Sequence, residues 1–245
     1  MNRIGVHRKG ARLVAVGLVV IIVGMVFAAS RNAALADPKP PMPIVTVKDA
    51  GPWRLSVVTG ESSKGAGVTF NVQDPAALAA YAAAVGQIGP SVFDGQSEVL
   101  VLVTFRYPLS IERFTDLMRA SAVSVKSYRI RTFESDGRRG TVGGAPEPDG
   151  TILSSQHLSS IVQREQIKSG LATITVAGVI DAEVVLNREG YDSLARNGTD
   201  VFLVDVMRGV AARELAKAGE HHVPMDEITL QPIYWFMEDF GMTGP

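Results

Sequence analysis

The chain has 245 residues, of which 46% are hydrophobic, and its formal net charge is −1. A chain of this length and composition can bury the core of one medium domain or of two small ones, which argues against an intrinsically disordered protein. It contains no cysteine, which excludes disulfides, thiolate metal sites and cysteine nucleophiles.

The N-terminus predicts a membrane segment. The first 12 residues carry four basic side chains and no acidic one, and an uncharged apolar run follows from Leu13 to Ala29. This run is just long enough to span a bilayer and is longer than the core of a usual signal peptide. We therefore expect a cytoplasmic basic segment at 1–12, a transmembrane signal-anchor helix at 13–30, and all later residues outside the cytoplasm. The alternative is a secreted protein, cleaved after Ala36.

Residues 31–43 are expected to form a short spacer between membrane and domain, because their stretch DPKPPMP is rich in proline. Beyond Ala36 the chain carries 19 basic and 25 acidic residues, a net charge of −6. A nucleic-acid partner is not expected, since phosphate binding requires a basic surface. The partners that remain are the membrane, through the N-terminal helix, and a protein or peptide.

The first folded part is expected at residues 44–97, as a β-rich and helical subdomain. Short β-prone runs separated by glycines predict a small sheet or hairpin. Asp74-Pro75 then suits the cap and the first position of an alanine-rich helix. We expect this helix to end at Gly86 or at Gly89-Pro90.

Residues Glu98 to Phe133 predict a strand, a helix and a second strand. The run VLVLVTF is continuously apolar, as in a central buried strand. Ser110 can cap a helix that places Phe114 and Leu117 on one face. The following run, SVKSYRIRTF, alternates as a half-exposed strand does.

Residues Thr173 to Met207 repeat this order. The first strand of this second unit is expected to be kinked or bulged at Gly178. Asn187 can cap the helix, and Asn197-Gly198 can end it before the returning strand. Two such units in succession predict an α+β fold for residues 98–245. The expected form is the split βαβ, ferredoxin-like arrangement, an antiparallel sheet with helices on one face.

The same stretch carries a family resemblance. The sequence VAGVIDAEVVLNREGYDSLARNGTDVFLVDV, within Thr173 to Met207, resembles the second half of subtilase propeptides, the protease-inhibitor-like prodomains. In that family a strand that ends in a glycine and a small-apolar stretch leads to a short helix and a valine-rich last strand. The resemblance implies the ferredoxin-like fold, and inhibition of a peptidase as an activity.

The segment between the two units, Glu134 to Gly150, is rich in glycine, proline and polar residues. It predicts an exposed loop or a mobile hairpin tip that could bind a partner. Its Arg138 and Arg139 are candidate partner contacts. A helix is expected next, from Ile152 to Lys168.

The C-terminal stretch ITLQPIYWFMEDFGM is the most aromatic of the chain. Its Pro232 predicts an edge strand or coil. Tyr234, Trp235 and Phe236 are candidates for a partner-docking or membrane-interface patch. The alternative is that these side chains pack against the sheet.

Few groups of residues resemble a chemical site, and none has the spacing that catalysis or metal binding requires. In His221-His222 with Asp226 and Glu227, the two adjacent histidines point in different directions. The pairing of Ser154 or Ser155 with His157 has a spacing that is common in helices. The glycine-rich turn from Gly140 to Gly144 lacks the lysine of a phosphate loop, and Asp181 with Glu183 fits a strand face exposed to solvent. We therefore predict no catalytic, cofactor-binding or metal-binding residue.

The favoured hypothesis is a non-enzymatic binding or regulatory domain, anchored in the membrane and placed outside the cytoplasm. It would act through a protein or peptide in the cell envelope. The alternatives are an exported hydrolase that uses His157 or His221 with nearby acidic residues, and a peptidase-inhibitor-like module.

Overall fold

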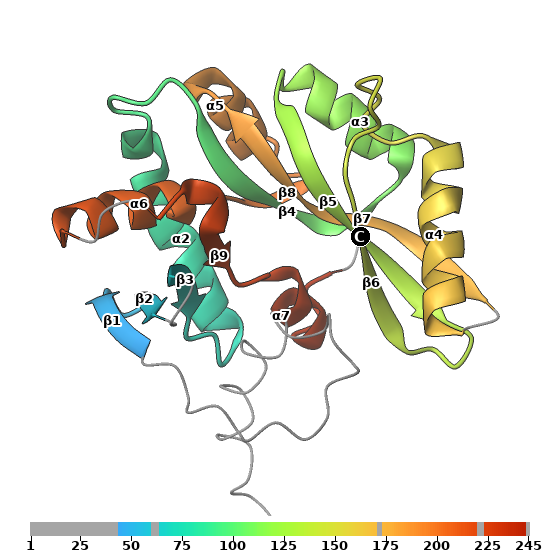
Figure 1. The fold of residues 1–245 in the computed structure, drawn as a ribbon, viewed down its shortest axis with the longest axis horizontal. Helices are drawn as coiled ribbons and strands as arrows, with labels where there is room; N and C mark the ends of the chain where they lie inside the picture. Colours follow the sequence, from blue (N-terminus) through green and yellow to red (C-terminus); the bar gives the residue numbers. More distant parts are fainter. Residues whose placement is uncertain (1–43, 60–63, 171–172, 220–222, 244–245) are drawn as a thin grey trace, which may run out of the picture. The chain divides into compact units, whose positions relative to one another are not determined.

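The computed structural model describes residues 44–59, 64–170, 173–219 and 223–243, which belong to one compact unit (Figure 1). They form an α+β fold with two sheets. The strands are β1 (Ile44–Asp49), β2 (Trp53–Thr59), β3 (Lys64–Phe70), β4 (Val99–Leu109), β5 (Ser124–Glu134), β6 (Arg139–Gly144), β7 (Ile174–Leu186), β8 (Val201–Asp205) and β9 (Ile228–Leu230). The α-helices are α2 (Pro75–Val92), α3 (Ile111–Ala120), α4 (Ser155–Ser169), α5 (Arg188–Arg196), α6 (Met207–Lys217) and α7 (Tyr234–Asp239).

The predicted membrane anchor at 13–30 and the spacer at 31–43 lie outside the described residues. Among the helices that are described, none has the length and apolar character needed to cross a bilayer.

The smaller sheet has the order β1-β2-β3-β9. Its first three strands form an antiparallel meander, and β9 pairs in parallel with β3, with Ala66 opposite Ile228 and Val68 opposite Leu230. This sheet therefore combines strands from residues 44–97 and from residues 98–245, which were expected to form successive parts of the chain.

The larger sheet has the order β6-β5-β7-β4-β8, and every neighbouring pair in it is antiparallel. The strand–helix–strand unit β4-α3-β5 holds β7 between its two strands. The second unit, β7-α5-β8, holds β4 between its strands in the same way. The two units are thus interleaved rather than placed side by side.

Local signals of the sequence explain several element boundaries. The side chain of Ser110 accepts a hydrogen bond from the backbone N–H of Arg113 at the start of α3, and Asn187 caps α5 in the same way through Gly190. The predicted irregularity at Gly178 is confirmed to within two residues, because the pairing of β7 shifts between Asp181 and Val179 with β4 and on both sides of Gly178 with β5. Gly178 has φ +144, and a Cβ atom would lie 2.4 Å from the carbonyl oxygen of Leu109, so only glycine fits.

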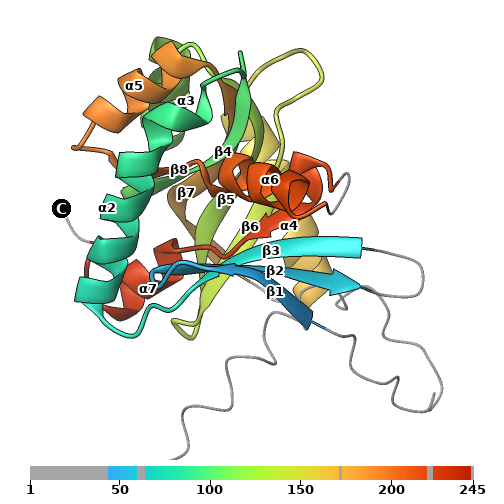
Figure 2. The same cartoon turned by 90° about the vertical axis from the view of Figure 1, so that its left-hand side faces the viewer.

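One face of the larger sheet carries α3 and α5 (Figure 2), and apolar side chains are buried beneath these helices. The ring of Phe114 in α3 lies 5.8 Å from the rings of Phe105 and Tyr128, which project from β4 and β5. A hydrogen bond of 3.3 Å joins the hydroxyls of Ser193 in α5 and Ser121 at the end of α3. These contacts place the two helices next to each other over the sheet.

The opposite face was expected to be exposed to solvent, and this expectation is wrong. Helices α6 and α7 cover it, and apolar side chains of both helices are buried there. Met207 and Leu215 of α6 and Met237 of α7 are each at most 1% exposed. Polar side chains on this face of β5 and β7 consequently lie inside the protein.

Helix α2 differs from the sequence prediction. It does not end at Gly86 or Gly89-Pro90 but continues to Val92, which is fully buried. Of the alternatives predicted for Glu134 to Gly150, the structure has the hairpin, which β5 and β6 form. At the C-terminus the predicted edge strand is β9, and helix α7 after it was not predicted.

Candidate functional site

A row of four charged side chains crosses the covered face of the larger sheet. Arg129 and Arg131 alternate along β5, and Asp181 and Glu183 alternate along β7 beside it. We call these four residues the charged row. Arg129 Nε donates to Asp181 Oδ1 at 2.6 Å, and Asp181 is only 2% exposed. Burial raises the pKa of Asp181, and the Arg129 guanidinium opposes that shift without cancelling it.

The second carboxylate of the charged row is held from α6. Arg208 Nη2 donates to Glu183 Oε1, and Ser127 Oγ donates to Glu183 Oε2 at 3.0 Å. Arg208 is itself buried and also donates from Nε to the carbonyl of Ile228, at 2.8 Å. Burial is the largest single influence on the pKa of Glu183 and raises it, but the hydrogen bonds from Arg208 and Ser127 and the charges of Arg208 and Arg129 together outweigh burial, so the pKa lies below its ordinary value. Glu183 is therefore a fixed anion.

Arg131 joins the sheet to α7. Its Nε donates to Glu238 Oε1 at 2.8 Å, and its Nη2 donates to Glu238 Oε2, so the pair is bidentate. Its Nη1 donates to the carbonyl of Gly140 at 2.9 Å and to Thr141 Oγ1 at 2.8 Å. The Arg131 side chain is 4% exposed and the guanidinium carbon lies 5.8 Å from the ring centre of Tyr234. One arginine thus ties β5, β6 and α7 together.

A further buried carboxylate lies at the end of β8. Asp205 Oδ2 accepts a hydrogen bond of 2.6 Å from the Tyr81 hydroxyl of α2, and Asp205 Oδ1 accepts one of 2.9 Å from the backbone N–H of Met207. Burial raises the pKa of Asp205 to about 6, although both hydrogen bonds oppose the shift. Burial and the nearby carboxylate also raise the pKa of Tyr81 well above its ordinary value.

The residues of the charged row form ion pairs. Each carboxylate of the charged row is bonded to an arginine, and the described residues contain no group of three His, Cys, Asp or Glu that could hold a metal ion. The pairing is incomplete: Asp181 Oδ2, Thr104 Oγ1 and Arg208 Nη1 are buried and have no hydrogen-bond partner among the described atoms. Buried polar atoms of this kind cost stability when neither water nor another group bonds to them.

A shallow cleft of about 340 Å³ opens beside the charged row, between β6 and α7. Its walls include Arg139 and Trp235, which are nearly 100 residues apart in the chain. Arg139 Nη2 donates to Asp239 Oδ1 at 3.1 Å, and both side chains remain about half exposed or more. We call it the β6–α7 cleft, and its lining residues are Arg131, Arg139, Thr141, Trp235, Glu238 and Asp239.

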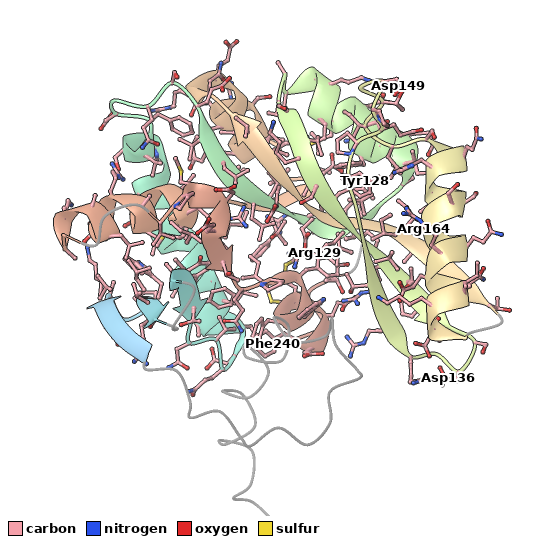
Figure 3. The ribbon with its side chains drawn as sticks, in the orientation of Figure 1. Tyr128, Arg129, Asp136, Asp149, Arg164 and Phe240 are labelled. Carbon is pink, nitrogen blue, oxygen red and sulfur yellow. The ribbon has the colours of Figure 1, made fainter. Side chains whose placement is uncertain are left out.

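The structure separates the five predicted interaction residues into two groups. Arg139 and Trp235 meet in the β6–α7 cleft. Arg138 instead forms ion pairs of 2.6–2.7 Å with acidic neighbours of the β5–β6 hairpin, whose tip carries Asp136 (Figure 3). Tyr234 is 1% exposed, and Phe236 packs its ring 5.6 Å from that of Phe70. The patch available to a partner is therefore smaller than the aromatic run suggests.

The other groups considered from the sequence have local roles. Ser154 caps α4 by accepting from the backbone N–H of His157, whose Nε2 lies 3.2 Å from the carbonyl oxygen of Ala145. Within the glycine-rich segment, a Cβ atom at Gly144 would lie 2.3 Å from the ring of Tyr128, so this glycine permits packing in β6. His221 and His222 lie outside the described residues.

The sequence did not lead to a prediction of the charged row, because Asp181 and Glu183 also fit a strand face exposed to solvent. A usable signal was present: basic residues alternate in YRIR of one predicted strand, and acidic residues alternate in DAE of another. Complementary charges at alternate positions favour pairing of those two strands. Comparisons of the chain with protein-family models, with curated proteins and with solved structures find no match.

Proposed function

We propose that this protein is a membrane-anchored, non-enzymatic domain outside the cytoplasm that binds a protein or peptide through the β6–α7 cleft. One observation carries the proposal: the fold brings Arg139 and Trp235 together at a surface depression, where each is partly accessible. A half-buried tryptophan beside an arginine is the composition typical of interface anchors. The paired state of the charged row gives no comparable support to catalysis.

The proposed location follows from the basic flank at 1–12 and the apolar run at 13–30. Fusion of alkaline phosphatase to the C-terminus tests it, because the enzyme is active only outside the cytoplasm. Active fusions in the membrane fraction support an anchor. Mass spectrometry of the N-terminus distinguishes the anchor from a secreted form cleaved after Ala36.

For the fold, we infer the split βαβ, ferredoxin-like arrangement. The strand order β8-β4-β7-β5 with antiparallel neighbours supports it, and so do the crossovers through α3 and α5. In this assignment β6 and α4 are additions to the connection between β5 and β7. The cleft is consequently built by elements added to the basic arrangement, namely β6 and α7.

Photo-crosslinking tests the binding function directly. A benzophenone amino acid replaces Trp235 in one variant and Ile167 in another, and both are expressed in cells that make the native protein. Ile167 is the matched control because it is 76% exposed on α4, away from the lining of the cleft. We expect specific adducts from position 235 only. Equal adducts from both positions, or none from position 235, would refute binding at the cleft.

A second candidate, a peptidase-inhibitor-like module, is favoured by the same strand order together with the resemblance of Thr173 to Met207 to subtilase propeptides. The test is inhibition of subtilisin by the purified protein. Unchanged proteolysis at excess protein would rule this candidate out.

A further inference from the structure

Strand β6 ends the larger sheet, and its hairpin fixes which backbone groups face outward. Glu134 N donates to the carbonyl of Arg138, and Gly137 N donates to the carbonyl of Glu134, each at 2.9 Å. The pair Glu134–Arg138 is therefore hydrogen-bonded, and hydrogen-bonded pairs recur at every second position of an antiparallel ladder. It follows that β6 directs the N–H and C=O groups of its even-numbered residues toward β5. The groups that point away belong to Arg139, Thr141 and Gly143.

These outward backbone groups have no hydrogen-bond partner among the described residues. Proteins usually protect such edges with a bulge, a proline, a lysine or a covering element. At the other end of this sheet, α2 covers β8 and donates from Tyr81 to Asp205. In the smaller sheet, β1 has a bulge and carries Lys48. The pairing of β5 with β6 shows no register shift, and β6 contains neither lysine nor proline.

The sheet face on the side of α7 is open at Gly143. Gly143 is exposed, and among the described residues no atom lies within 4 Å of the position that its Cβ would take on that face. On the sheet face that α7 covers, Arg139 and Thr141 line the β6–α7 cleft together with Trp235. A chain paired with β6 would thus have every second side chain directed toward the cleft.

We propose that the partner is an extended peptide segment that adds to β6 as a sixth strand and places one apolar side chain against Trp235. This inference rests on the proposed binding function and specifies its mode. Outward N–H and C=O groups at every second residue are matched by an extended main chain. A second copy of the protein is a poorer fit, because a stable dimer buries about 800 Å² on each partner. The surface available here is a strand of six residues with one tryptophan beside it, which is smaller than the area a stable dimer buries.

Two substitutions of Gly143 distinguish the contribution of its outward N–H group from the effect of adding a side chain at this position. Gly143→Ala keeps the outward N–H and adds a methyl group where there is space. Gly143→Pro removes this N–H and puts a ring in the path of an added strand. Proline is tolerated at an outward position of an edge strand, and the extended conformation of Val142 suits a residue before proline. Both variants should therefore fold, which thermal melting would verify.

The probe is a random ten-residue peptide display library, selected on the full-length protein in detergent micelles. Selected peptides are then synthesised with a fluorophore, and their affinities are measured by anisotropy. We expect Gly143→Ala to bind within about twofold of the wild type and Gly143→Pro to bind at least about tenfold more weakly. Hydrogen exchange should show that the amides of Arg139, Thr141 and Gly143 become protected when peptide is added.

Three results would overturn strand addition. Equal binding to Gly143→Pro and the wild type would place the peptide elsewhere, while the binding function itself would stand. If no peptide is selected, the proposal that the partner is an extended peptide is refuted. The binding function itself is tested separately, by crosslinking from position 235. A dimer that the Gly143→Pro variant dissociates, observed by analytical ultracentrifugation, would make a second copy the occupant instead.

Discussion

Replacing Glu238 with glutamine tests whether buried ion pairs hold α7 against the larger sheet. Arg131 and Glu238 are 4% and 10% exposed, so the substitution leaves a buried guanidinium without its counter-charge. Breaking a buried pair in this way costs roughly 3–5 kcal/mol. Because Arg131 keeps its bonds to Gly140 and Thr141, we expect the lower end, about 3 kcal/mol. For a domain of this size, that lowers the melting temperature by about 6–12 °C.

Urea and thermal denaturation followed by circular dichroism measure this loss. Asp239→Asn is the matched control, because Asp239 lies on the same helix and pairs with Arg139 at 3.1 Å, but the two side chains are 61% and 48% exposed. A surface pair of this kind contributes about 0–1 kcal/mol. If Glu238→Gln were no more destabilising than Asp239→Asn, the structural role assigned to the buried pair would be refuted. The double variant Arg131→Met, Glu238→Leu should recover most of the loss, since it removes both charges.

Two further predictions concern buried groups elsewhere in the fold. Burial raises the pKa of Asp205 to about 6, so the folded state binds this proton more tightly than the unfolded state, and stability from this residue is lost as pH rises from about 4 to about 7. Asp205→Asn should therefore gain stability relative to the wild type over that range in urea denaturation, and a pH-independent difference would contradict the assignment. Gly178→Ala should cost about 2 kcal/mol or more, since φ is +144 and the new Cβ would lie 2.4 Å from the carbonyl oxygen of Leu109. Gly143→Ala, where there is space, should be nearly neutral by thermal melting, and equal losses in the two variants would count against the strain at Gly178.

Elements with local signals could be predicted from the sequence. The caps at Asp74, Ser110 and Asn187 are confirmed, as is an irregularity within two residues of Gly178. A cap or bulge is decided by a few neighbouring residues, because it depends on one side chain and the backbone next to it. The order strand, helix, strand around α3 and α5 follows from the same kind of signal.

Long-range contacts overrode local signals in α2. Gly89-Pro90 would normally end a helix, yet the helix continues because its last turn packs against α5. A Cβ atom at Gly89 would lie 1.9 Å from the hydroxyl of Tyr191, so the glycine allows this close approach. Val92 is then fully buried. Burial of the last turn offsets the hydrogen bond that Pro90 removes, and the sequence alone does not reveal that α5 lies there.

The charged row shows where prediction from a single strand stops. Acidic residues at alternate positions predict a solvated face only if no neighbouring element brings complementary charges. Arg129 and Arg131 could have indicated such a neighbour, because they alternate with the same period in another predicted strand. The sequence contains no such signal for Arg208 and Glu238. They come from helices α6 and α7, which follow the strands of the larger sheet in the chain and reach this face only through tertiary packing. The ion pair between Arg131 and α7 also fixes one wall of the β6–α7 cleft, so the buried charges position the surface proposed to bind a partner.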